Sequence, residues 1–140
     1  MSLNNVFDIA GSALVAETTR LASSASNMSN ANVVTGSPEG TYRAQYPVFQ
    51  EIQEESQQWM NNEVRAGVAV PQIYESQAEP VKQYQPNHPL ADKDGFVYSP
   101  NINYVEEMAN IISASRAYQM DLEMLNTSKQ LIQRTLQLGQ

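Results

Sequence analysis

The 140-residue chain contains no cysteine, which excludes disulfide bonds, cysteine-ligated zinc, iron–sulfur clusters and thiol catalysis. His88 is its only histidine, so a histidine-based metal site or proton relay has little support. Basic residues are scarce: 8 Lys and Arg against 15 Asp and Glu give a net charge of −7, which argues against nucleic-acid binding. No long apolar run and no basic-then-apolar N-terminal segment occur, so neither a membrane span nor a cleaved signal peptide is predicted.

Proline and glycine, which interrupt helices, are concentrated in the middle of the chain. All seven prolines and four of the six glycines lie in residues 36–100, whereas residues 1–35 contain only Gly11 and residues 101–140 only Gly139. This distribution predicts an N-terminal helix in 1–35, a small β- and loop-rich domain in 36–100 and a C-terminal helix in 101–140. The expected fold class is therefore α+β, with two long terminal helices forming an antiparallel coiled-coil hairpin around a small β-rich insert.

The C-terminal part carries the clearest periodicity. Apolar or aromatic residues recur every seven positions, and a second series follows four positions later with two polar interruptions, as in a coiled coil. Asn103 is placed to cap the start of the helix and Gly139 to end it. A helix of roughly 35 residues is about 50 Å long, so it needs another long element to pack along. The first series is Tyr104, Ile111, Tyr118, Leu125 and Ile132, and the second is Met108, Ser115, Leu122, Lys129 and Leu136.

The N-terminal part has a matching pattern, in which Phe7, Leu14, Leu21 and Met28 also recur every seven residues. Its second half is rich in serine and asparagine, which compete for backbone hydrogen bonds and therefore form helices poorly. Such a helix is marginal when isolated. We therefore expect it to order only when it has a partner.

Four short strands are expected in the middle part, over residues 42–52, 64–70, 81–84 and 96–98, with turn residues between the last two. A core built from about 60 residues is small, so this domain would be marginal alone. Nine acidic and four basic residues within 39–94 give a charge of −5. Most of the excess negative charge therefore belongs to the insert, where we expect it to face solvent.

Two patterns could indicate metal binding or catalysis, and neither fits well. Residues 92–95 (Asp-Lys-Asp-Gly) match part of a calcium-binding loop, but Leu90 stands at the first ligand position and Asn101 at the twelfth, where a glutamate is required. A hairpin turn fits this segment better. Glu106 and Glu107 are adjacent carboxylates, but their place in the first turn of a helix accounts for them. The sequence nominates no catalytic residue, no cofactor and no metal ligand.

Several motifs at both ends of the chain resemble the bacterial flagellar rod and hook proteins. The N-terminal signature of that family is similar to residues 8–14, 25–32 and 34–36. The C-terminal motifs resemble those of a proximal-rod member, and the short length also favours a member of that kind over the larger hook and distal-rod subunits. These C-terminal motifs are residues 88–92, 95–97, 99–103, 107–108, 112–119, 125–127 and 135–140.

The resemblance implies a structural subunit of an axial drive shaft rather than an enzyme. Such subunits pair their terminal helices into a coiled coil that lines the rod and display the β-rich insert outward. They are exported through the flagellar type III apparatus without a cleaved signal peptide and assemble in the periplasmic part of the basal body. The implied partners are further copies, other rod proteins, a base-proximal adaptor and the export gate, with no nucleic acid, small-molecule substrate or membrane span.

An assembly interface is expected along the two helices. Two paired helices bury one stripe each, so Val6, Ile9, Val105 and Ile112 should lie partly on flanking faces, which favours association with neighbouring subunits. The alternative is a soluble helical-hairpin adaptor or export-chaperone-like binding module, which would form a stable monomer or dimer without polymerising. The expected interface residues are Phe7, Leu14, Leu21, Met28, Asn27, Asn30, Asn32, Met108, Ile111, Tyr118, Leu122, Leu125, Ile132 and Leu136.

Overall fold

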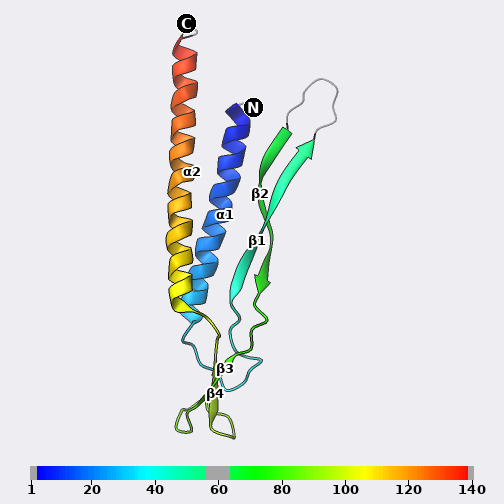
Figure 1. Ribbon diagram of the computed structural model, residues 1–140, viewed down its shortest axis with the longest axis vertical. Helices are drawn as coiled ribbons and strands as arrows, with labels where there is room; N and C mark the ends of the chain where they lie inside the picture. Colours follow the sequence, from blue (N-terminus) through cyan, green and yellow to red (C-terminus); the bar gives the residue numbers. More distant parts are fainter. Residues whose placement is uncertain (1–2, 56–63, 139–140) are drawn as a thin grey trace. The chain divides into compact units, whose positions relative to one another are not determined.

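The computed structural model describes residues 3–55 and 64–138 and confirms the α+β class, with two helices and small β-sheets between them in the sequence (Figure 1). The C-terminal helix has the expected length of 35 residues, and the N-terminal helix, with 28 residues, ends at Asn30 within the expected segment 1–35. Trp59 and Gly139 lie outside the described residues. The elements are α1 (Leu3–Asn30), β1 (Gln45–Glu55), β2 (Val64–Glu75), β3 (Val81–Tyr84), β4 (Phe96–Ser99) and α2 (Tyr104–Leu138).

Strand β2 extends beyond its expected end at residue 70, because it continues through Pro71 to Glu75. It pairs with β1 in a two-stranded sheet, and the two arrows run in opposite directions (Figure 1). In such a sheet each strand keeps one unpaired edge, where the missing N–H of a proline costs no ladder hydrogen bond. The proline that was expected to end the strand is therefore tolerated within it.

The chain divides into two compact units. The first unit comprises residues 1–19, 48–72 and 113–140, and the second comprises residues 20–47 and 73–112. In the first unit, Ser12 Oγ of α1 accepts a 3.1 Å hydrogen bond from the N–H of Val68 in β2. A Cβ at Gly67 would lie 2.9 Å from that oxygen, so a residue without a side chain allows the strand to approach the helix closely.

In the second unit, β3 pairs with β4 in antiparallel register from Val81↔Ser99 to Tyr84↔Phe96. The other edge of β4 pairs with Thr35, since the N–H of Thr35 donates to the carbonyl of Tyr98 at 2.8 Å and the N–H of Tyr98 donates back at 2.9 Å. β4 therefore lies between two backbone partners.

The expected turn at residues 92–95 is confirmed. Gly95 has a φ of 82°, a left-handed conformation that glycine adopts without steric cost. Asp92 Oδ1 accepts hydrogen bonds from the N–H groups of Asp94 at 2.9 Å and Phe96 at 2.8 Å. This aspartate is therefore bonded within its own turn, as in a typical Asx turn.

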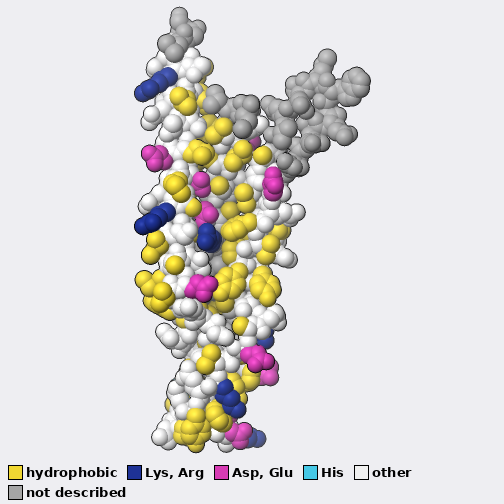
Figure 2. Space-filling view, viewed as in Figure 1, with side chains coloured by type: hydrophobic (Ala, Val, Ile, Leu, Met, Phe, Trp, Pro, Cys, Tyr) yellow, Lys and Arg dark blue, Asp and Glu magenta, His cyan; other side chains and the backbone are white. Residues whose placement is uncertain are grey.

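The buried hydrophobic core is made almost entirely of small side chains. Its members among the described residues are Ala10, Ala16, Ala31, Ala44, Val97 and Ala114. Many larger hydrophobic side chains instead reach the surface. Figure 2 shows hydrophobic side chains on one face of the molecule among comparatively few charged groups. No helix in the described part of the chain is long and apolar enough to cross a membrane.

Candidate functional site

Of the two seven-residue series expected on α2, the first largely agrees with the structure and the second differs from it. Ile111, Tyr118, Leu125 and Ile132 are half-buried, as expected for inward positions, whereas Tyr104, the first member of the series, is 47% exposed. The residues that the structure buries lie three positions after members of the first series, instead of the expected four. They are Glu107, Ala114 and Ser128, and Asp121 in the same series is half-buried. Small side chains such as alanine and serine let a helix approach its neighbour closely, whereas Met108, Leu122 and Leu136, which the periodicity selected as companions, are exposed.

The expected interface residues fall into three classes of exposure. Asn27 is completely buried, whereas Asn32, Met108, Leu122 and Leu136 are exposed. The remaining members are half-buried, which places them against neighbouring elements while leaving part of each side chain accessible. They are Phe7, Leu14, Leu21, Met28, Asn30, Ile111, Tyr118, Leu125 and Ile132.

Helix α2 presents large apolar side chains to solvent at helical spacing. Val105 is 73% exposed, and Met108 and Ile112 are exposed three and seven positions later, which puts all three on one face of the helix. Further along, Met120, Met124 and Leu131 are also exposed. Val105 and Ile112 thus lie on a flanking face as expected, whereas Val6 and Ile9 are half-buried. Sequence patterning did not single out the methionines at 120 and 124.

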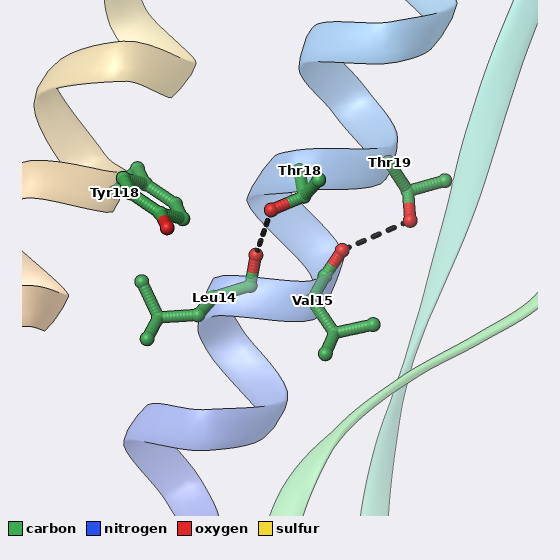
Figure 3. Close-up of a pocket in the computed structure, with 5 residues that line it drawn as sticks. All are labelled: Leu14, Val15, Thr18, Thr19 and Tyr118. Atoms are coloured by element: carbon green, nitrogen blue, oxygen red, sulfur yellow. Dashed lines mark hydrogen bonds between the residues drawn. The ribbon is translucent and has the colours of Figure 1, made fainter.

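A pocket of about 340 Å³ in the first unit is lined by Leu14, Val15, Thr18, Thr19 and Tyr118 (Figure 3). The Thr18 hydroxyl donates to the carbonyl of Leu14 at 2.7 Å, and the Thr19 hydroxyl donates to the carbonyl of Val15 at 2.9 Å. Both hydroxyl groups are therefore bonded to the backbone of their own helix. The pocket offers mainly apolar atoms to an occupant, which suits an apolar side chain better than a polar small molecule.

A buried polar cluster in the second unit joins the end of α1, the start of β1 and the start of α2. Asn27 Oδ1 accepts hydrogen bonds from the Tyr42 hydroxyl at 3.0 Å and from the N–H of Gln45 at 2.8 Å. Asn27 Nδ2 donates to the carbonyl of Gln45 at 3.0 Å and to Glu107 Oε1 at 3.2 Å. The Asn27 carboxamide thus connects the end of α1 to the start of β1 and the start of α2. No pattern in the sequence indicates that Tyr42, Gln45 and Glu107 lie around it.

The Glu107 carboxylate is 1% exposed. Its Oε2 atom has no hydrogen-bond partner among the described residues. Tyr46, at the start of β1, has its pKa raised above 10.0, first by burial and then by the negative charge of Glu107. The effect on Tyr46 indicates that the field of the buried carboxylate reaches the first residues of the strand.

The candidate chemical groups do not converge on a reactive site. Within residues 3–55 and 64–138, no group of three or more His, Cys, Asp or Glu residues could hold a metal ion. Glu107 is buried against Asn27, whereas the neighbouring Glu106 is exposed. His88 Nδ1 accepts a hydrogen bond from the N–H of Leu90 at 3.2 Å, which is a local structural contact.

Comparison with known proteins identifies relatives over the whole chain. Residues 93–138 match the family described as flagellar basal body rod FlgEFG protein C-terminal. The chain is 49% identical to the flagellar basal-body rod protein FlgC of Yersinia enterocolitica and 47% identical to that of Salmonella typhimurium, in each case over all of both chains. It is also 37% identical to the protein of the same name from Buchnera aphidicola subsp. Schizaphis graminum, again over all of both chains.

Proposed function

The chain belongs to the FlgC family of flagellar basal-body rod proteins, and on that premise we propose that it polymerises through its two terminal helices into the proximal part of the axial drive shaft. It is a structural rod subunit and not an enzyme. It assembles with other rod proteins in the basal body.

The observation that carries the proposal is the exposure of large apolar side chains along α2. Leu122 is 39% exposed, Met124 50% and Leu131 53%, whereas the buried core consists mainly of alanine. Met124 and Leu131 share one face of the helix with Met120, which is 64% exposed, whereas Leu122 lies on another face. Exposed apolar side chains of this kind are typical of a protein that buries them against other chains. The pocket between Leu14 and Tyr118 adds a place where an apolar side chain of a neighbouring subunit can insert.

In the proposed arrangement α1 and α2 form an antiparallel coiled-coil hairpin. The half-buried series, Phe7, Leu14, Leu21 and Met28 on α1 with Ile111, Tyr118, Leu125 and Ile132 on α2, holds the two helices together. The exposed Asn32, Met108, Leu122 and Leu136 contact neighbouring subunits. Residues 1–35 and 101–140 thus build the rod core, and residues 36–100 form the outward domain, which carries most of the negative charge.

The proposal also covers the route to the rod. The subunit leaves the cytoplasm through the flagellar type III apparatus without a cleaved signal peptide and assembles in the periplasm. Its partners there are further copies, neighbouring rod proteins, the base-proximal adaptor and the export gate. A chain without cysteine suits this route, because it cannot form incorrect disulfides in an oxidising compartment.

Leu122→Asp tests the proposal directly. The substitution places a charge in an exposed apolar surface, so the subunit should fold normally but fail to pack against its neighbours. In cells that lack the native protein, we expect the variant to restore neither motility nor complete rods. Gln130→Asp introduces the same charge at an exposed polar position of α2 and should restore both.

The helix content of each purified variant, measured by circular dichroism, separates failed assembly from failed folding. If Leu122→Asp enters basal bodies at the level of the unaltered chain, the proposed interface is wrong. If the unaltered chain is missing from purified basal bodies and stays a stable monomer or dimer, the adaptor or chaperone-like alternative is favoured instead.

A further inference from the structure

The second half of α1 is buried through polar groups. Its buried side chains are Ser23, Ser24 and Asn27, which contribute little hydrophobic stabilisation and have weak helix propensity. Polar contacts therefore add to the packing of the half-buried Leu21 and Met28 in holding residues 20–30 in a helix. The Asn27 side chain forms hydrogen bonds with both β1 and α2.

The hydrogen-bonding capacity of Asn27 is fully used. A carboxamide has two N–H donors and an oxygen with two lone pairs, and the four contacts with Tyr42, Gln45 and Glu107 take all four places. Because the side chain is 0% exposed, water cannot replace a missing partner while the helix stays packed. If one of these partners is missing, a polar atom of Asn27 stays buried without a hydrogen bond, so the four bonds stabilise the packed helix only together.

The position of the first turns of α2 also depends on the end of α1. The Asn27 amide donates the 3.2 Å hydrogen bond to Oε1 of the buried Glu107 side chain, and the Tyr46 side chain also interacts with this carboxylate. Loss of a donor to a buried carboxylate is strongly unfavourable. The end of α1 thus stabilises the first turns of α2 in this position, although the two residues are 80 positions apart.

We propose that the Asn27 carboxamide is a three-way latch, which makes the ordering of residues 20–30 conditional on the simultaneous presence of residues 42–45 and of the first turns of α2. Until the first turns of α2 have packed in place, the second half of α1 stays unfolded. The device is a property of the second unit alone and does not depend on how the subunit polymerises.

Amide hydrogen exchange of the full-length protein tests the latch. Asn27→Asp removes the donors to Gln45 and Glu107 and should lower protection by about tenfold in residues 21–30, 42–46 and 104–110 together. Asn30→Asp is the matched control, because Asn30 Nδ2 donates to the carbonyl of Ser26 within the same helix. It should change exchange in α1 only.

A second substitution distinguishes a direct latch from general destabilisation. In the Asn27→Asp background, Glu107→Gln supplies an N–H that can donate to the new carboxylate, so protection of residues 104–110 should partly return. Equal exchange in Asn27→Asp with and without Glu107→Gln would overturn the proposal.

Tyr42→Phe covers the case in which Asn27→Asp does not fold. It removes a single hydrogen bond to Asn27, and the described hydrogen bonds of the Tyr42 side chain reach Ser26 and Asn27 only. We expect about threefold faster exchange in residues 104–110, transmitted through Asn27. Unchanged exchange there would contradict the latch.

Discussion

The N–H of Val68 donates a 3.1 Å hydrogen bond to Ser12 Oγ, and this bond attaches β2 to α1 within the first unit. The same hydroxyl donates to the carbonyl of Ile9 at 2.8 Å, so its position is fixed from both sides. Gly67 precedes Val68 in the strand, and a Cβ there would meet Ser12 Oγ at 2.9 Å. The hydrogen bond between Ser12 and Val68 therefore depends on the absence of a side chain at residue 67.

Gly67→Ala should destabilise the protein, because the new methyl group forces the Ser12 hydroxyl away from the N–H of Val68. We expect a loss of about 1 kcal/mol in the free energy of unfolding, the usual size for one hydrogen bond, measured by urea denaturation. In a Ser12→Ala background the nearest atom to the new methyl group is the Cβ of residue 12 at 3.5 Å, which is an ordinary contact. Gly67→Ala should then cost much less, and equal costs in the two backgrounds would contradict the coupling.

Gly11→Ala, at the position next to Ser12 in α1, should instead stabilise the protein. A Cβ at Gly11 meets nothing within 4 Å, and alanine is favoured over glycine inside a helix by roughly 0.5–1 kcal/mol. The same urea denaturation should therefore show a gain in the free energy of unfolding. A loss would indicate that the α1 surface at Gly11 is packed more tightly than the structure describes.

Asn103→Ala should weaken the start of α2. Asn103 Oδ1 accepts hydrogen bonds from the N–H groups of Val105 at 3.1 Å and Glu106 at 3.4 Å, so the expected N-cap is confirmed. Removing an N-cap side chain typically costs about 1 kcal/mol. Thermal unfolding followed by circular dichroism should show a lower midpoint, whereas Asn103→Asp, which keeps the acceptor, should retain most of the stability.

Acid should loosen the turn that joins β3 and β4. The N–H of Phe96 has the largest effect on the pKa of Asp92, which lies below 3.8; burial, second in size, raises it, and the Tyr98 hydroxyl, third, lowers it. Because the folded pKa lies below the unfolded one, the stabilisation is complete above pH 3.8 and is lost as the pH falls through the folded value. The amide chemical shift of Phe96, followed by NMR, should report this loss, and Asp92→Asn should remove the dependence on acid.

Base should act on the same turn through Tyr98. Burial, and then the hydrogen bond to Asp92, raise the pKa of Tyr98 above 10.0. A folded pKa above the unfolded one means that the stabilisation is present below pH 10.0 and is lost as the pH rises through the folded value. Tyr98→Phe should therefore abolish the alkaline change in the same NMR titration, while an alkaline change that persists in this variant would assign it to another group.

Much of the fold could be predicted because it rests on local signals. Proline and glycine placement bounds the helices, Asn103 marks the start of α2, and the residues of β3 match the predicted strand at 81–84. The end of β2 was predicted too early, since the cost of Pro71 depends on whether the strand has a free edge. Whether an edge is unpaired depends on how the strand is placed in the sheet, which the sequence of the strand alone does not show.

The candidate surface was harder to predict than the fold. The periodicity identified Ile111 and Tyr118 as inward residues, but it assigned Met108 to the same seam, where the structure buries Glu107 instead. Hydrophobicity cannot report close approach, which depends on side-chain size at positions such as Ala114. Nor can it report the long-range partners of Asn27, because four hydrogen bonds to separate segments leave no periodic trace in the sequence.

The alanine-rich core has a thermodynamic consequence. Unfolding raises the heat capacity in proportion to the apolar area that becomes newly wetted, about 12–15 cal/mol/K per residue in ordinary globular domains. In this chain residues such as Val105, Met120 and Leu136 are already wetted in the folded subunit, and alanine adds little more. The heat-capacity increment of the isolated subunit should fall below that range, which gives a shallow stability curve. Under the proposed packing against neighbouring subunits, those side chains would leave water and the curve would become steeper.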